Sequence, residues 1–324
     1  MGTVTRHLAV MGTSFVLTVS SASRETALVA SEAGVREVER IETLLSTWRD
    51  DTPLSRLNAA APGVATPVSA ELFGVLKNVF EWEEKTGGTF NPAVLPLVTA
   101  WGLRTGGRVP DAATLARARE ASRPGLFTLE ESSLQVTRRT AEAGIDEGAW
   151  GKGWALDKAA AAMRAAGATS GVLDLGGQVL AFGEETITDA ADPRDRALSV
   201  GRLRLQGASA STSGNSERGV TVNGRRIGHL LDPHTGNPAP DFGSVTVVAF
   251  SGLTADVLST AFFVLGPEKG LALSEWLRVS GVAHEALFFL EGEKGCRLRV
   301  SMSPGMRRLV SFSHSKKSLK GAHP

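Results

Sequence analysis

Asp256 and Thr260 lie four positions apart in a segment that is otherwise apolar, ADVLSTAFF. On a helix, residues at this spacing share one face, so the two side chains would point the same way. A carboxylate buried on an apolar helix needs a cation or hydrogen bonds. One carboxylate and one hydroxyl suit Mg²⁺, which takes few protein ligands and completes its shell with phosphate and water. The pair therefore predicts a magnesium site, and the alternative is that Asp256 caps the helix N-terminus.

Residues 145–157 (IDEGAWGKGWALD) combine several glycines with Asp146 and Lys152 directly before a predicted helix. Glycines let the backbone approach a ligand closely, and a helix N-terminus with a lysine suits a phosphate. The G-x-x-x-x-G-K-[ST] spacing of a P-loop is missing. The segment therefore predicts a phosphate site of another kind, or else a strand-to-helix loop capped by Asp146.

Two further segments place glycine, hydroxyl and imidazole groups at fixed points. Gly176-Gly177 follows a predicted strand, and two residues without side chains leave room for a flat ligand. Ser213 could offer a hydroxyl group to the same ligand. The alternative is that the glycines form a tight turn and that Ser213 lies in a polar loop. The segment HLLDPHTG (residues 229–236) predicts a stiff turn that Asp232 helps to form. This turn would hold His229 at a fixed distance from Asp232. A zinc site is disfavoured because no third ligand lies nearby at metal spacing.

The elements that would position these groups do not follow a strict βαβ alternation, and no G-x-G-x-x-G follows a strand, so a doubly wound sheet is disfavoured. Periodicity and capping residues predict helices at residues 25–45, 69–85, 111–120, 152–166 and 254–265. β-type residues predict strands at residues 8–19, 170–175, 198–205, 244–250, 287–290 and 297–300. The acidic stretch 183–196 lacks periodicity and is predicted to be a loop.

Composition excludes several classes of protein. The 324-residue chain has 35 Lys+Arg against 34 Asp+Glu, which gives no support to a nucleic-acid or anionic-membrane partner. One cysteine cannot form an internal disulfide and excludes cysteine-rich zinc or iron–sulfur sites. No stretch approaches the ~18 apolar residues of a membrane span, and the start shows neither a signal peptide nor a cysteine for a lipid anchor. We therefore expect a cytoplasmic protein with one domain over residues 1–313 and a disordered Lys-rich tail at 314–324.

Taken together and in this order, these clusters resemble the ApbE family, the FAD:protein FMN transferases. The similarity runs from Met11 to about Leu277. Met11-Gly-Thr resembles the opening strand motif of the family, and residues 46–58 resemble the segment that supplies an aromatic residue to the flavin, with Trp48 where the family usually has Tyr. Segments that resemble other family motifs follow in family order at residues 87–92, 145–157, 172–177, 212–214, 229–238 and 255–260.

The resemblance implies which residues contact the ligands. FAD would be contacted by Met11, Trp48, Thr89, Phe90, Asn91, Asp146, Lys152, His229 and Leu230. Mg²⁺ would be held by Asp256, Thr260 and the backbone carbonyl of Ala149, which agrees with the independent argument from the helix face. Two residues depart from the family, because Asn91 stands where Asp is common and Glu147 replaces the usual Leu.

The resemblance also implies a reaction and a fold. A Thr or Ser hydroxyl of a partner protein, in an Asp-x-x-[Ser/Thr]-Gly-Ala-[Thr/Ser]-like sequence, would attack the FMN-side phosphorus of FAD, and AMP would leave. Mg²⁺ would neutralise developing charge, Lys152 would add positive potential, and His229 would position the phosphates or assist proton removal. The alternatives are an FAD pyrophosphatase that gives FMN and AMP, and a non-catalytic FAD-binding protein. The implied fold is α+β: two intertwined T-fold-like halves with antiparallel sheets and outer helices, and FAD in the cleft between them.

Overall fold

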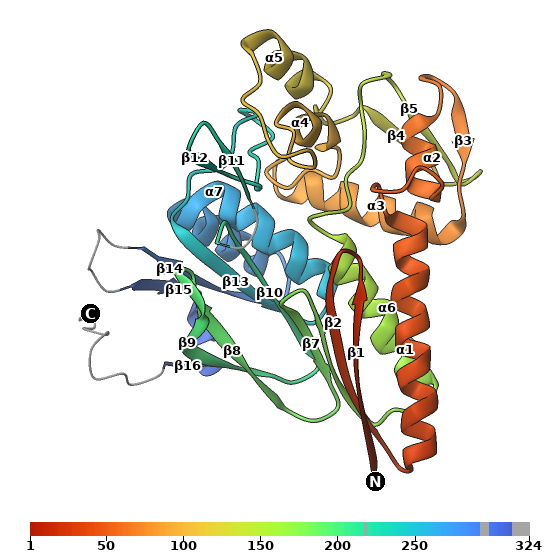
Figure 1. The fold of residues 1–324 in the computed structure, drawn as a ribbon, viewed down its shortest axis with the longest axis vertical. Helices are drawn as coiled ribbons and strands as arrows, with labels where there is room; N and C mark the ends of the chain where they lie inside the picture. Colours follow the sequence, from red (N-terminus) through yellow and green to blue (C-terminus); the bar gives the residue numbers. More distant parts are fainter. Residues whose placement is uncertain (217–218, 292–297, 313–324) are drawn as a thin grey trace.

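A large antiparallel sheet forms the centre of the molecule (Figure 1). The computed structural model describes residues 1–216, 219–291 and 298–312. The strands are β1 (Gly2–Val10), β2 (Thr13–Ser21), β3 (Ala65–Pro67), β4 (Phe127–Glu130), β5 (Gln135–Arg138), β6 (Ser170–Leu175), β7 (Gln178–Phe182), β8 (Thr186–Asp192), β9 (Asp195–Leu205), β10 (Ala208–Gly214), β11 (Gly219–Val222), β12 (Arg225–Gly228), β13 (Gly243–Ala249), β14 (His284–Leu290), β15 (Arg299–Met302) and β16 (Val310–Phe312). The large sheet has the order β1-β2-β6-β7-β10-β13-β14-β15, and every neighbouring pair in it is antiparallel.

The helices are α1 (Arg24–Leu45), α2 (Pro53–Ala59), α3 (Ala70–Lys85), α4 (Leu95–Ala100), α5 (Ala112–Glu120), α6 (Gly151–Ala165), α7 (Gly252–Val279) and the 3₁₀ helix η1 (Pro304–Arg308). Those that cover one face of the large sheet are α1, α6 and α7. α1 packs on β1 and β2, α6 on β6 and β7, and α7 on β10, β13 and β14. The predicted helices at 25–45, 69–85, 111–120 and 152–166 are confirmed. Ser23, Ser69 and Asp111 cap three of them by accepting a backbone N–H with their side chains.

A small sheet with the order β16-β9-β8 packs on the opposite face of the large sheet. The prediction of a loop over 183–196 is therefore wrong, because β8 and the start of β9 form a hairpin there. The buried positions of β8 are Ala190 and Asp192, and Arg194 binds the Asp192 carboxylate. A strand whose inward side chains are an alanine and an ion-paired aspartate lacks the alternating apolar pattern that marks a strand in a sequence.

One other predicted boundary is also corrected. Residues 8–19, expected as one strand, contain a turn in which Met11 and Gly12 have φ values of 52° and 66°, and this turn joins β1 to β2. The predicted helix over 254–265 is confirmed and ends at Gly266 as expected, because that glycine has a non-helical φ of 77°. The label α7 covers this helix and the segment that follows the kink. Pro267 then begins the second helical segment, since its fixed φ suits the first turn of a helix.

The closing hairpin predicted near the C-terminus is confirmed by the antiparallel pairing of β14 with β15. The tip of that hairpin and the tail at 314–324 lie outside the described residues. Antiparallel sheets with helices outside them confirm the α+β class. The three-stranded sheet β3-β5-β4, the hairpin β11–β12 and helices α2, α4 and α5 lie together beyond one end of the large sheet (Figure 1).

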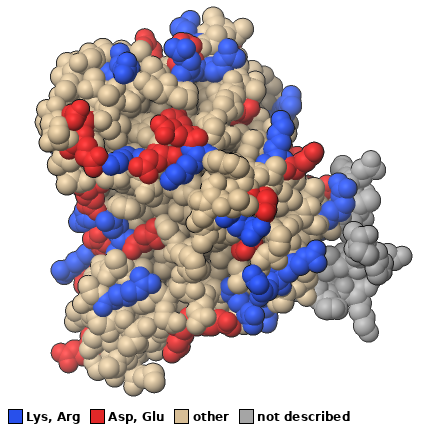
Figure 2. All heavy atoms as spheres, turned by 180° about the vertical axis from the view of Figure 1, so that it is seen from behind, with Lys and Arg blue, Asp and Glu red and all other residues tan. Residues whose placement is uncertain are grey.

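The face of the molecule shown in Figure 2 carries charges of both signs. On the side shown in Figure 2, basic and acidic side chains are intermingled, and no area of one sign spans the molecule. This mixture agrees with the near-zero net charge of +1. A search of the described helices finds none long and apolar enough to cross a membrane.

Glu83 is a buried acid on α3 that should make stability depend on pH. Its side chain is 5% exposed, and its Oε1 has no hydrogen-bond partner among the described residues. Burial, with a smaller contribution from Glu84, raises the pKa of Glu83 from 4.5 to about 7. The folded state keeps this proton up to about pH 7, whereas the unfolded chain releases it near pH 4.5. The free energy of unfolding should therefore fall as pH rises through this window and be level above it.

We expect Glu83→Gln to unfold with a free energy about 1–3 kcal/mol higher than that of the parent at about pH 8, and with little difference at about pH 4. Urea unfolding followed by circular dichroism at the two pH values measures the difference. Glu81→Gln, which changes an exposed acid on the same helix, is the control. If both variants behave alike at high pH, the buried Glu83 carboxyl is not the titrating group.

Candidate active site

Asp256 lies near the start of α7, where α7 contacts the start of α6, and is 4% exposed. Its Oδ2 accepts a hydrogen bond from the backbone N–H of Gly153 at 3.1 Å, and its Oδ1 accepts one from Ser211 Oγ at 3.4 Å. Lys152 Nζ lies 3.3 Å from Oδ1 and 3.4 Å from Oδ2. The lysine supplies the cation that a buried carboxylate needs. These four contacts match the roughly four lone-pair sites of a carboxylate, so a metal ion would have to replace one of them, such as one of the two long contacts to Lys152.

Asp256 does not cap α7, so the capping alternative for this residue is excluded. The cap is Ser251, whose Oγ accepts the N–H of Thr254 at 3.3 Å. Asp157 of α6 reinforces this end by accepting Ser251 Oγ–H at 2.7 Å and two backbone N–H groups of α7 at 2.6 and 3.0 Å. Burial raises the pKa of Asp157, and these hydrogen bonds oppose the rise. Asp157 therefore fixes the start of α7 against α6, a role that the sequence did not suggest.

Hydroxyl groups from α7 and β10 surround this carboxylate. Thr260 is half-buried and shares a helix face with Asp256, as its spacing predicts. Ser259 Oγ lies 2.9 Å from Ser213 Oγ and 3.2 Å from Ser211 Oγ. Ser213 was predicted to contact the ligand, but its hydroxyl is buried and bonded within the protein. It therefore supports the neighbouring serines, and its contact with a ligand stays a prediction.

Arg104 joins the loop after α1 to the glycine-rich segment before α6. Its guanidinium donates to Asp146 Oδ2 and, at 2.7 Å, to the carbonyl oxygen of Thr47. Its Cζ lies 4.7 Å from the centroid of the Trp48 ring, a cation–π distance. Two predicted site residues, Trp48 and Asp146, are thereby brought together. The sequence alone does not indicate a role for Arg104, because one arginine in a loop carries no periodic or motif signal.

Glu147, which replaces the usual Leu of the family, is 9% exposed and makes specific hydrogen bonds. It accepts the Thr47 N–H at 3.0 Å and also the Thr47 hydroxyl. Burial, followed by repulsion from Asp146, raises the pKa of the Glu147 carboxyl. The proposed capping role of Asp146 is wrong, because the residue at the N-cap of α6 is Trp150.

Two neighbouring turns hold Met11, which lies close to α6, and the glycine pair. A Cβ on Gly151 would lie 3.6 Å from Met11 Cε, so the Met11 side chain reaches the start of the helix. Gly176 and Gly177 form the turn between β6 and β7 with φ values of 61° and 84°. The N–H of Gly176 donates to the carbonyl of Ser14 at 2.9 Å, which sets this turn beside the one that holds Met11.

The segment that contains His229 is a rigid turn after β12. Asp232 accepts the N–H of His234 at 2.9 Å and the hydroxyl of Thr235 at 3.0 Å, so it forms the turn as the sequence predicts. His229 is half-buried at the start of this segment. A Cβ on Gly88 would lie 3.3 Å from His234 Cε1, which shows that the turn packs against the glycine pair that follows α3.

Four residues predicted to contact FAD are buried, namely Thr89, Phe90, Asn91 and Leu230. Asn91 Nδ2 donates to the carbonyl of Ser122 at 2.6 Å, and its Oδ1 accepts the N–H of Ala93 at 2.6 Å. Both ends of this amide are therefore used by the backbone. A contact between FAD and these four residues would have to involve their backbone or a movement of their side chains.

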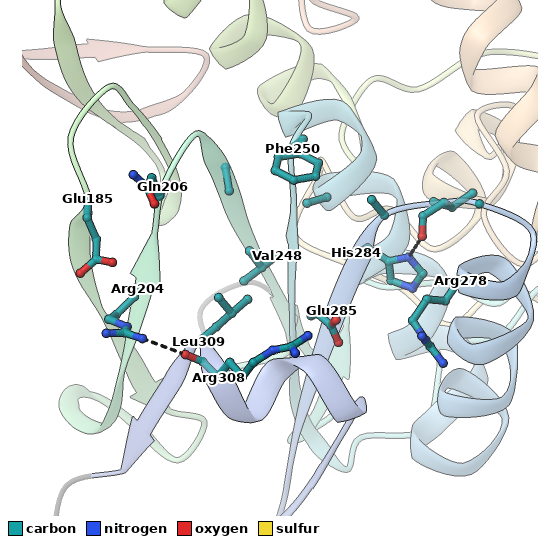
Figure 3. A pocket seen from close by; sticks show the side chains of 15 residues that line it. Glu185, Arg204, Gln206, Val248, Phe250, Arg278, His284, Glu285, Arg308 and Leu309 are labelled. Carbon is teal, nitrogen blue, oxygen red and sulfur yellow. Dashed lines mark hydrogen bonds between the residues drawn. The ribbon is translucent and has the colours of Figure 1, made fainter.

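A separate pocket of about 710 Å³ lies beside β9, β13, β14 and the end of α7 (Figure 3). None of the predicted site residues lines it. Arg204 donates to the carbonyl of Arg308 at 3.2 Å, and Arg278 is ion-paired with Glu275 at 2.8 Å. Both ring nitrogens of His284 are also in hydrogen bonds. Because these polar groups already have partners within the protein, the pocket is not counted as part of the candidate site.

The metal ligands predicted from the sequence form an all-oxygen set of carboxylate, hydroxyl and carbonyl groups, which suits Mg²⁺. Asp256 and Thr260 share one face of α7, and Ala149 lies in the turn just before α6. Within residues 1–216, 219–291 and 298–312, no group of three or more His, Cys, Asp or Glu side chains offers a competing metal centre. The residues present therefore fit the ion chemically.

Comparisons with known proteins show the family to which the chain belongs. The sequence model of the ApbE family matches residues 11–283. An FAD:protein FMN transferase of Klebsiella pneumoniae is 32% identical over 237 residues, covering 72% of this chain and 75% of the relative. Another, of Treponema pallidum, is 34% identical over 257 residues, covering 73% and 71%. The crystal structure of the ApbE protein of Thermotoga maritima matches with a TM-score of 0.86 at 26% identity, covering 95% of this chain and 99% of that one.

The contact between α6 and α7 should tolerate only glycine at position 153. A Cβ there would lie well inside van der Waals contact with the carbonyl oxygen of Gly252. We expect Gly153→Ala to lower the free energy of unfolding by about 1–3 kcal/mol, because α7 must move away from α6. Urea denaturation measures this change.

The control is Gly74→Ala on α3, where an added Cβ meets nothing within 4 Å. Alanine should stabilise that helix by about 0.5–1 kcal/mol. If the two variants have equal stability, the close approach of α6 and α7 does not restrict position 153.

Proposed function

This chain belongs to the ApbE family, and on that premise we propose that it transfers FMN from FAD to a hydroxyl group of a target protein. The observation that carries the proposal is the Asp256 carboxylate, held by Lys152 and the N–H of Gly153 at the start of α6. This arrangement combines an oxygen ligand for a cation, a lysine and a helix N-terminus. These are the groups that a metal-bound pyrophosphate requires.

In the proposed reaction, a Thr or Ser hydroxyl oxygen of the target attacks the FMN-side phosphorus. A new P–O bond forms, the bond to the bridging oxygen breaks, AMP leaves with that oxygen, and the hydroxyl proton is released. Asp256, Thr260 and the carbonyl of Ala149 would hold Mg²⁺, which when bound neutralises charge on the pyrophosphate oxygens. Lys152, in the first turn of α6, would add a positive charge beside the pyrophosphate.

The remaining predicted residues have supporting roles in this proposal. Met11 lies beside the start of α6, and the turn of Gly176 and Gly177 lies beside Ser14; both would border the flavin. Trp48 would stack on the flavin ring. His229, on a turn that Asp232 makes rigid, would position the phosphates or assist removal of the hydroxyl proton.

The proposal includes three expectations from the sequence that remain predictions. They are the Asp-x-x-[Ser/Thr]-Gly-Ala-[Thr/Ser]-like acceptor sequence, the single domain over residues 1–313 and the cytoplasmic location. Hydrolysis of FAD and storage of FAD without turnover are the alternatives, and Asn91, where the family commonly has Asp, is the residue in this sequence that could favour them. Because the Asn91 amide is buried and bonded to backbone groups, its position gives no support to either alternative.

The direct test incubates the purified chain with FAD, Mg²⁺ and a target protein that carries the acceptor sequence, and then records the intact mass of the target. The proposal expects a target heavier by one FMN and release of one AMP. Free FMN and AMP without an adduct would indicate hydrolysis. Unchanged FAD would indicate storage. Either of these results would overturn the proposed transfer.

We expect Asp256→Asn to reduce Mg²⁺-dependent transfer by about 10²-fold or more, because the variant keeps the shape of the side chain but loses the charge that binds the metal. The rate of adduct formation across a Mg²⁺ titration measures this loss, and thermal unfolding checks the fold. Asp189→Asn, at a 68% exposed side chain on β8, is the matched control. Parental turnover in Asp256→Asn would remove Asp256 from the metal site.

A further inference from the structure

We propose that Arg104 is a positioning residue that presents Trp48 to the flavin ring. The inference rests on the proposed function, in which Trp48 stacks on the flavin. It adds a residue that neither the sequence motifs nor the comparisons single out. The proposal stands on the contacts that the Arg104 guanidinium makes with two segments of the chain.

The Arg104 guanidinium is held at three points. It donates to the carbonyl oxygen of Thr47 at 2.7 Å, to the hydroxyl of Thr47 at 2.6 Å and to Asp146 Oδ2. The Arg104 and Asp146 side chains are 20% and 11% exposed, so solvent screens this ion pair only in part. A planar guanidinium with these three bonds has a fixed orientation, which a flexible ammonium would lack.

The loop that carries Trp48 is tied down around the same point. The carbonyl and hydroxyl oxygens of Thr47 accept hydrogen bonds from Arg104, and the Thr47 N–H donates to the Glu147 carboxylate at 3.0 Å. Further along the loop, Thr52 Oγ1 donates to the carbonyl of Ser46 at 2.8 Å. The backbone on both sides of Trp48 is therefore anchored, although the tryptophan ring itself is at the surface.

The indole of Trp48 has one face covered and is otherwise open. The Arg104 guanidinium carbon lies 4.7 Å from the ring centroid, whereas the residue as a whole is 67% exposed. A large aromatic side chain that is held rigidly and left exposed is suited to stacking against a flat ligand. The Arg104 guanidinium holds the orientation of the indole through a cation–π contact with one face of the ring. The other face of the indole is the one proposed to stack on the isoalloxazine.

The test measures the dissociation constant of FAD from the full-length chain through quenching of flavin fluorescence, in the absence of acceptor protein. Arg104→Ala should weaken FAD binding about 5- to 30-fold, the equivalent of about 1–2 kcal/mol. Arg104→Lys keeps the charge but lacks the planar fork and should recover only part of the loss. Arg49→Ala is the control, because Arg49 follows Trp48 directly but pairs with Asp51 at the surface; its affinity should stay within about twofold of the parent.

A double-mutant cycle with Trp48→Ala shows whether Arg104 acts through the indole. In the Trp48→Ala background, Arg104→Ala should change FAD affinity by less than about twofold. Equal losses in both backgrounds, parental affinity in Arg104→Lys, or tighter binding in Arg104→Ala would each overturn the proposal; the last result would show that Arg104 blocks the flavin position. The transfer assay on the parent chain is run separately, so failure of the proposed function is distinguishable from failure of this inference.

Discussion

The structure depends on one buried charge, the carboxylate of Asp256. An aspartate on an apolar helix face is stable only where cations and N–H groups reach it. Here Lys152 and the N–H of Gly153 reach it from α6, and Ser211 reaches it from β10. The carboxylate thus requires α6, α7 and the central sheet to meet at one point. The same groups form the centre of the candidate active site.

Several features of the fold follow from the need for that meeting point. Position 153 must be glycine because the backbone of α7 lies directly against it. Asp157 then holds the start of α7 by accepting Ser251 Oγ–H and two backbone N–H groups. The antiparallel β10 brings Ser211 and Ser213 to the same place. The residues that stabilise this region are therefore also those to which the proposed function assigns ligand binding, which limits how freely they can change.

The sequence was most informative where chemistry and periodicity coincide. The spacing of Asp256 and Thr260 on an apolar helix predicted their shared face, apolar periodicity located α1 and α3, and Asp111 as a capping residue located α5. It was least informative where a role depends on contacts distant in the chain. Arg104 meets Thr47 and Asp146 across 57 and 42 positions, and no local pattern indicates such contacts. Strand β8 was missed for a different reason, because its buried positions are Ala190 and the ion-paired Asp192.

The central claim is that Asp256 and Thr260 hold the metal at the pyrophosphate of FAD. The most direct measurement is a crystal structure of the chain with FAD and Mn²⁺, in which the anomalous signal locates the ion independently of activity. The account predicts one anomalous peak in contact with Asp256 Oδ, Thr260 Oγ1 and the carbonyl of Ala149, beside the FAD phosphates. A peak at other residues, or FAD bound with its phosphates away from the start of α6, would contradict it.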